Sequence, residues 1–111
     1  MPQSTPQARI VLTTVASPEQ AASLGRTLVE EQLVACATVV PGIESIYRWQ
    51  GKIETSRETL LLLKTLPGQM PALEERLHAL HGYEIPEFLA LGVESGSAGY
   101  LDWLQASLSR T

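Results

Sequence analysis

One stretch, residues 35–65, constrains the fold of this chain more than any other. Its first half is rich in β-branched and aromatic residues, its second half contains the run Leu60–Leu63, and Gln50-Gly51 stands between the halves. Such residues favour strands, and a glycine supplies the positive φ that a tight hairpin turn needs. The stretch therefore predicts two long antiparallel strands that fold back at Gln50-Gly51. Pro41-Gly42 interrupts the first strand, which predicts a bulge in a strand at the edge of the sheet.

The predicted strands are long for the chain that carries them. An arm from Ala37 to Trp49 would extend about 44 Å, whereas a compact domain of this size has a diameter of about 34 Å. The hairpin should therefore overhang its own domain. The leucine run points side chains to both faces of the sheet, so both faces should be covered. The chain's own helices can cover one face, and a second copy of the chain or another partner should cover the other.

The remaining segments predict the element order β-α-β-β-α-β-α. Ser17, Pro18 and Gln20 have the pattern of a helix start, with an N-cap serine and a proline in the first turn. The order predicts an α+β fold, the ferredoxin-like β-α-β-β-α-β arrangement with an extra C-terminal helix. The expected segments are a disordered tail at 1–7 and a single domain at 8–111, with a strand at 8–15, helices from 17 to about 31 and from about 70 to 81, a strand at 84–95 and a helix after 97.

Two details of this arrangement follow from local patterns. Met70, Leu73, Leu77 and Leu80 are spaced to form the buried face of the second helix, and Gly82 is expected to end it. In a ferredoxin-like sheet, the strand at 8–15 and the second arm of the hairpin occupy the centre, and these are the most continuously apolar strands of the chain.

Composition excludes several classes of function. The chain has 111 residues, a net charge of -4 and one cysteine, which argues against nucleic acid as a partner and against a disulfide framework or a multi-cysteine zinc motif within one chain. No apolar run approaches the ~18 residues of a membrane span, and Met1–Gln7 has no apolar signal segment. We therefore expect a cytoplasmic protein without membrane contact. No catalytic motif is present, so an enzyme is not expected.

A few side chains are candidate metal ligands. The thiolate of Cys36 would suit copper(I) or zinc, although a free cysteine at a strand start also packs as a small hydrophobic residue. Glu74, His78 and His81 would share one side of a helix, although a histidine near a helix C-terminus also suits the helix dipole. The metal-ligating candidates are Cys36, His81 and Glu84, and the expected ion is a divalent metal, copper first.

A second group of polar residues predicts a binding cluster. Lys64, Glu58, Tyr83 and Glu84 would bind a small anion or cation in a cleft between subunits, or would form an ion-pair network that closes the assembly. Tyr47, Trp49 and Trp103 would line a ligand pocket or anchor a subunit interface. A further hypothesis gives Lys64, Tyr83 and Glu84 an acid-base role, which requires these side chains to converge on one open volume.

Six motifs follow one another along the chain: Ala35-Cys36-Ala37, Pro41-Gly42, residues 45–54, residues 61–65, residues 81–87 and residues 100–104. In these motifs, and from about Ile10 to Leu108, the chain resembles the CutA proteins, the divalent-cation tolerance family. The resemblance implies a tight homotrimer in which long hairpins wrap neighbouring subunits, in the manner of the PII signalling proteins, and a role in tolerance of copper and other divalent cations. The alternative it leaves open is a PII-like sensor of a small metabolite.

This sequence departs from the family pattern at two points. Gly82 stands where the family usually has proline, so the backbone that positions His81 and Tyr83 has more freedom here. The other cysteine positions of the family are not cysteine in this chain, which argues against a thiol-rich copper site.

Overall fold

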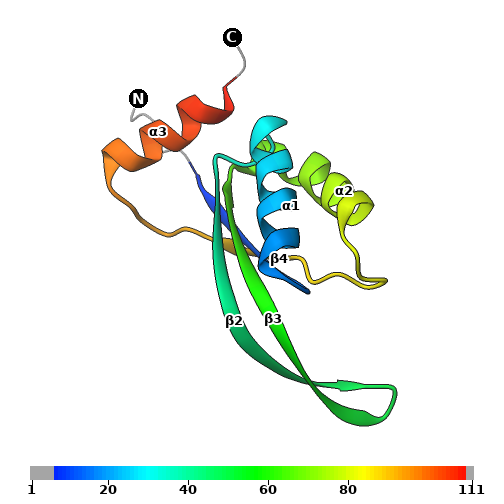
Figure 1. Ribbon diagram of the computed structural model, residues 1–111. Coiled ribbons are helices and arrows are strands. Elements are labelled where there is room, and N and C mark those ends of the chain that lie inside the picture. The colour runs from blue at the N-terminus through cyan, green and yellow to red at the C-terminus, as the bar shows by residue number, and fades with distance from the viewer. Residues whose placement is uncertain (1–6, 110–111) are drawn as a thin grey trace.

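The computed structural model describes residues 7–109, so the predicted tail at 1–7 lies outside the described residues except for Gln7. A four-stranded antiparallel sheet has the order β2-β3-β1-β4, and Figure 1 shows the helices around it. The predicted α+β class, the central position of β1 and β3 and the edge position of β2 are thereby confirmed. The elements are β1 (Arg9–Val15), α1 (Pro18–Glu30), β2 (Cys36–Trp49), β3 (Lys52–Thr65), the 3₁₀ turn η1 (Pro67–Gln69), α2 (Met70–Leu80), β4 (Leu89–Gly92) and α3 (Ala98–Leu108).

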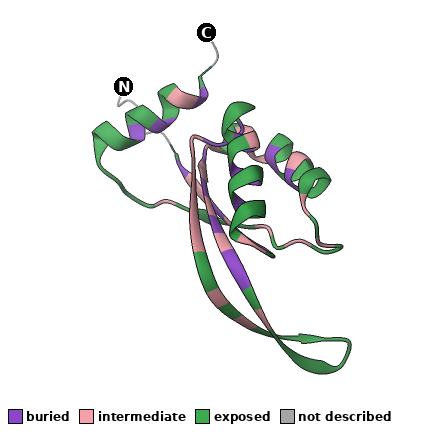
Figure 2. Cartoon of the chain, viewed as in Figure 1, coloured by how far each residue is buried: buried purple, intermediate pink, exposed green. Residues whose placement is uncertain are grey.

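Helices α1 and α2 cover one face of the sheet and form the main core with it (Figure 1). Alternate residues of the central strands, Val11, Leu61 and Leu63, are completely buried on this side, as the two-residue period of a strand requires. Leu28 of α1 and Leu73 of α2 are buried equally well against them. In Figure 2 the buried positions follow the inner sides of the two helices and the upper part of β3.

The second face of the sheet is covered only at one end. There α3 packs Leu101, Leu104 and Leu108 against Ala8. Beyond α3, cross-strand pairing aligns Leu62 with Leu12 and Leu12 with Leu89, and Leu89 is 57% exposed. We call this surface the open face; its residues are Ile10, Leu12, Leu60, Leu62, Leu89 and Leu91. The leucine run predicted that the chain's own helices cover one face of the sheet and that a partner covers the other. In the described residues, the open face is the one that the helices leave largely uncovered.

The β2–β3 hairpin extends beyond the rest of the molecule (Figure 1). The described residues measure 54 × 26 × 23 Å along their principal axes, which confirms the predicted overhang. The turn falls at Gln50 and Gly51, with φ of 51° and 80°. Positive φ at both positions is typical of a type I′ turn, whose twist matches that of the two strands.

Three sequence-based details are wrong. The fourth strand is limited to Leu89–Gly92 instead of 84–95, because pairing with β1 starts at Leu12 and the preceding segment is held by side-chain hydrogen bonds. Leu80 is 39% exposed rather than buried. Gly82 does not adopt the positive φ of a terminating glycine, because α2 ends through the extended backbone of His81.

Candidate functional site

The bulge in β2 decides which side chains face the site. Val40 pairs with Leu60 and Ile43 pairs with Glu58, so β2 contains one more residue than β3 between these two pairs. The extra residue exchanges the two faces of the outer part of β2. Beyond the bulge, Tyr47 and Trp49 therefore lie on the same side of the hairpin as Glu58, where Ile46 and Arg48 would lie in an unbroken strand.

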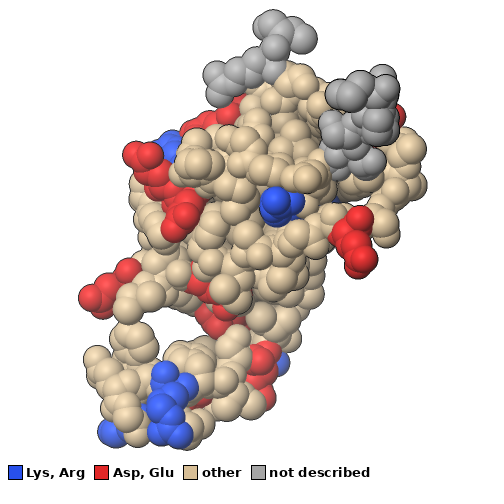
Figure 3. Space-filling model, turned by 180° about the vertical axis from the view of Figure 1, so that it is seen from behind, with Lys and Arg blue, Asp and Glu red and all other residues tan. Residues whose placement is uncertain are grey.

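A cavity of about 580 Å³ lies between the hairpin and the segment that follows α2. We call it the acidic cavity. Figure 3 shows a hollow between the hairpin and the body of the molecule, with acidic side chains beside it. The hairpin contributes one wall and the segment 82–87 the other. The lining residues are Thr14, Ser45, Tyr47, Trp49, Ser56, Glu58, Gly82, Tyr83, Glu84, Ile85 and Glu87.

Glu58 and Tyr83 connect the two walls of the acidic cavity. The Tyr83 hydroxyl donates a hydrogen bond of 2.6 Å to Oε2 of Glu58, and Glu58 is 8% exposed. Burial and the adjacent carboxylate both raise the pKa of Tyr83, since each disfavours the phenolate. Tyr83 therefore remains a protonated donor and holds the Glu58 carboxylate in place.

The charge of the lining is entirely negative. Glu58, Glu84 and Glu87 line the cavity, and no lysine or arginine does. Partial burial and the charge of Glu58 raise the pKa of Glu87, since both disfavour its ionised form. Within residues 7–109 the one ion pair joins Arg76 to Glu31, far from this lining. The lining therefore disfavours an anion.

His81 fixes the segment that forms the second wall. The backbone N–H of Tyr83 donates to Nδ1 of His81 at 3.1 Å, so Nδ1 carries the lone pair. The neutral ring then carries its proton on Nε2, which lies 2.8 Å from the carbonyl oxygen of Thr14 and donates to it. Burial lowers the pKa of His81, against the opposing effects of the Thr14 carbonyl and the Glu58 charge. Both ring nitrogens are thus engaged within the chain.

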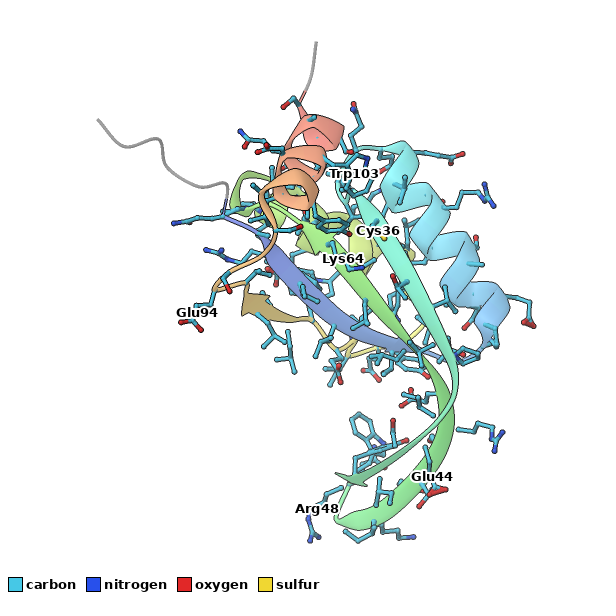
Figure 4. All side chains as sticks on the ribbon, turned by 90° about the vertical axis from the view of Figure 1, so that its left-hand side faces the viewer. Cys36, Glu44, Arg48, Lys64, Glu94 and Trp103 are labelled. Carbon is cyan, nitrogen blue, oxygen red and sulfur yellow. The ribbon has the colours of Figure 1, made fainter. Side chains whose placement is uncertain are left out.

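The structure separates Lys64 from the cluster that the sequence predicted. Lys64 lies six residues from Glu58 on β3, a separation of about 20 Å along a strand. Its ammonium group instead lies 3.9 Å from the Sγ of Cys36 and 6.0 Å from the ring centroid of Tyr100. Figure 4 shows Lys64 and Cys36 together at the α3 end of the sheet. Acid-base work by Lys64 together with Tyr83 and Glu84 therefore lacks the required convergence within one chain.

The three predicted metal ligands do not meet in one chain either. Cys36 is in register with Lys64 and Ile10, whereas His81 bonds to Thr14, four residues further along β1, about 13 Å away. In the part of the chain that the structure describes, no group of three or more His, Cys, Asp or Glu side chains is placed to hold a metal ion. The donor set of a single chain therefore does not fit a copper ion.

Several lining residues were missed by the sequence reasoning. Glu87 was not among the predicted site residues, although its three-residue spacing from Glu84 around Pro86 is a usable signal. Ser45 and Ser56 pair across the hairpin and could have been found by counting the bulge as one extra residue. Thr14 lines the cavity because β1 pairs with β3. This pairing joins segments that are distant in the sequence, so no local pattern around Thr14 indicates it.

The pH dependence of stability should report the His81 hydrogen bonds. The pKa of His81 is lower in the folded chain than its unfolded value of 6.5, so the unfolded chain binds more protons as the pH falls. The contribution of His81 to stability is present above pH 6.5 and is lost as the pH falls through the folded pKa. In metal-free buffer, replacement of His81 by asparagine should flatten the fall of the thermal midpoint below that pH.

The comparison variant for this measurement is His78→Asn, because His78 is exposed on α2 and makes none of these hydrogen bonds. Its charge also lowers the pKa of His81, but as the smallest of the causes, so this variant should change the pH profile less than loss of the His81 ring does. An unchanged pH profile in the His81 variant would contradict the role assigned to the ring.

The strand order and the long hairpin define a class of protein, the ferredoxin-like α+β proteins with an overhanging hairpin. Residues 9–107 match the family model described as CutA1 divalent ion tolerance protein. The chain belongs to this family, as the resemblance predicted. Within residues 7–109, no helix has both the length and the apolar character to cross a membrane.

Individual relatives agree with this assignment. The divalent-cation tolerance protein CutA of Thermus thermophilus is 50% identical over 96 residues, which cover 86% of this chain and 93% of that protein. The protein CutA, chloroplastic, of Arabidopsis thaliana is 42% identical over 98 residues, covering 88% of this chain and 54% of that protein. The crystal structure of CutA1 from Oryza sativa superposes with a TM-score of 0.91 at 39% identity, and the match covers 97% of this chain and 100% of that chain.

Proposed function

We propose that the chain acts as a homotrimer in the cellular response to divalent cations, copper first, and that it catalyses no reaction. The observation that carries the proposal is the open face, where leucines of three strands align without cover from the chain's own helices. Contiguous exposed apolar surface of this kind is typical of a protein interface. A second copy supplies an apolar surface of the same shape, and the overhanging hairpin supplies an arm that reaches it.

The hairpin tip supports the same assembly. Ile46 and Ile53 are 67% and 63% exposed, and the tip projects beyond the body of its own chain (Figure 1). Apolar side chains on a projecting arm gain burial only against another molecule. We therefore assign the tip a role in gripping a neighbouring subunit.

Assembly also determines where a metal ion could bind. Cys36, His81 and Glu84 remain the proposed ligands, but they do not meet in one chain, so a neighbouring subunit has to complete any copper site. His81 would also have to release either the Tyr83 amide or the Thr14 carbonyl to free a ring nitrogen. Cytoplasmic location is part of this proposal, although the Arabidopsis relative is named chloroplastic.

Size-exclusion chromatography with light scattering tests the assembly, and the expected mass is three times that of one chain at micromolar concentration. Calorimetric titration with Cu²⁺ tests the metal site, with the variants Cys36→Ala and His81→Ala beside the control His78→Ala. A monomer would contradict the assembly. Weak Cu²⁺ binding that is equal in all variants would contradict a specific site at Cys36 and His81.

The PII-like alternative, a sensor of a small metabolite, has one observation in its favour. The acidic cavity has the volume of a small-molecule site, and the proposed trimer would place a neighbour's hairpin near it. A thermal-shift screen addresses this alternative, because a ligand that binds the folded chain raises its apparent stability. No shift at millimolar ligand would count against a metabolite sensor.

A further inference from the structure

We propose that the acidic cavity of one subunit receives the hairpin tip of the next subunit, with Arg48 of that tip placed against Glu58 and Glu87. The inference rests on the proposed trimer and deepens it, because it names the residues through which the arm of one copy recognises its neighbour. It follows from three observations: charges of opposite sign that are unpaired on the two surfaces, the direction in which Arg48 points, and the continuity of the cavity with the open face.

The end of the hairpin is basic. Residues 45–57 contain three of the chain's eight lysines and arginines and a single acid. We call Arg48, Lys52 and Arg57 the basic tip, and all three are exposed. In Figure 3 the blue atoms of lysine and arginine gather at the end of the hairpin. Within residues 7–109 the one ion pair lies on the helical side of the molecule, so the basic tip forms no ion pair with the described part of its own chain.

The acidic cavity has the complementary charge. Glu58, Glu84 and Glu87 line it, and no lysine or arginine does. Besides burial, the charge of Glu58 raises the pKa of Glu87, which indicates that these two carboxylates repel each other. An arginine side chain between them would remove this repulsion, because its guanidinium group presents several N–H donors to carboxylates in a fixed geometry. Each surface therefore carries the charge that the other lacks.

Arg48 points away from the cavity of its own chain. Tyr47 and Trp49 line that cavity, and successive residues of a strand point to opposite sides of the sheet. Figure 4 shows Arg48 at the far end of the hairpin. The described residues measure 54 Å along the longest axis and 26 and 23 Å across it, so the arm that carries Arg48 extends beyond the body of its own chain. The chain thus presents Arg48 to a neighbour.

The cavity continues the surface that the proposed trimer covers. Glu58, Leu60 and Leu62 alternate along β3 and therefore share one side of the sheet. A copy that packs on the open face also approaches the cavity. The tip and the cavity are different surfaces, so their contact is head-to-tail, and such contacts can close into a ring. In a trimer each copy then inserts one tip and receives one.

A charge exchange tests the contact. Arg48→Glu and Glu87→Arg each place like charges together and should weaken association by about tenfold or more. The chain with both substitutions again places unlike charges together at every contact, so it should recover most of the loss. Light scattering over a dilution series measures association. For a trimer that stays intact on dilution, exchange of subunits between two labelled samples measures the dissociation rate.

Two outcomes of the charge exchange would overturn the inference. One is that both single variants associate as the parent does. The other is that the double variant associates no better than the single variants, since a steric or folding effect at either position would not be reversed by the second substitution.

The controls reverse the same types of charge away from the contact. Arg26→Glu lies on α1 and Glu74→Arg on α2, both exposed on the helical side, and both variants should associate as the parent does. Added salt gives a second measurement, because it screens charges. Salt should weaken association of the parent more than association of the Arg48→Glu variant, and the reverse order would contradict an attractive charge contact.

The same samples separate this inference from the proposed assembly. A parent trimer whose mass and exchange rate are unaffected by Arg48→Glu rejects the tip contact and leaves the assembly through the open face standing. A monomeric parent rejects the assembly and the tip contact together.

Discussion

Replacement of Leu89 by aspartate is expected to convert the proposed trimer into folded monomers. Leu89 is 57% exposed in the single chain, so an aspartate at this position stays hydrated in the monomer and should leave its fold intact. In the assembly, each chain would place an unpaired carboxylate against an apolar surface, which costs several kcal/mol per copy. Since about 1.4 kcal/mol corresponds to a factor of ten in affinity, the substitution should weaken association by orders of magnitude.

Light scattering across a concentration series measures this effect. The matched control is Leu80→Asp, because Leu80 is also an exposed leucine, 39% accessible, but lies on α2 at the other face of the sheet. The control should retain the parent mass. If the Leu89 variant keeps the parent mass, the assignment of the open face is wrong. If, in addition, the Leu80 variant loses the parent mass, the interface lies on the helical side.

Replacement of Gly25 by alanine is expected to destabilise the chain by about 1–3 kcal/mol, although alanine is the better helix former. A Cβ atom at Gly25 would lie 2.8 Å from the Cβ of Ala37. Both atoms are attached directly to backbone, so α1 has to move away from β2 to relieve the contact. That movement loosens the packing of α1 on the sheet, where Leu24 and Leu28 belong to the main core.

The control makes the same substitution at Gly99 in α3, where an added Cβ would meet nothing within 4 Å. There the gain in helix propensity acts alone, and Gly99→Ala should stabilise the chain by up to about 1 kcal/mol. Thermal unfolding at one fixed protein concentration measures both variants, because the midpoint of an oligomer depends on concentration. Two shifts of the same sign would contradict the steric explanation.

Most of the fold could be predicted because its signals are local. Gln50-Gly51 marks the hairpin turn, and Ser17 caps the start of α1, where its side-chain oxygen accepts a hydrogen bond of 3.1 Å from the backbone N–H of Gln20. The segment after α2 could not be predicted in this way. Its course depends on His81, whose partner Thr14 is distant in sequence, and on Tyr83, whose partner Glu58 is on the hairpin. Alternating apolar residues there suggested a strand, but pairing starts only at Leu89.

The candidate site was predicted in part, for a related reason. Glu58, Tyr83 and Glu84 lie together as expected, because a polar loop beside a strand end brings such residues together often. Lys64 was added to them because it lies an even number of residues from Glu58 on the same strand. Such a spacing places two side chains on the same face of the sheet, but it does not place them close together along the strand. Removing Lys64 from the cluster changes the expected ligand from an anion or a cation to a cation alone.

The bulge between Val40 and Ile43 has a consequence for insertions and deletions in this hairpin. A deletion of one residue there would restore an unbroken strand without removing any cross-strand pair of the outer hairpin. Because directly paired residues face the same side of a sheet, Tyr47 and Trp49 would stay on the side of Glu58 as long as these pairs are kept. A single codon in the bulge therefore controls the bend and twist of the hairpin arm that forms one wall of the cavity, independently of the residues that form the pairs.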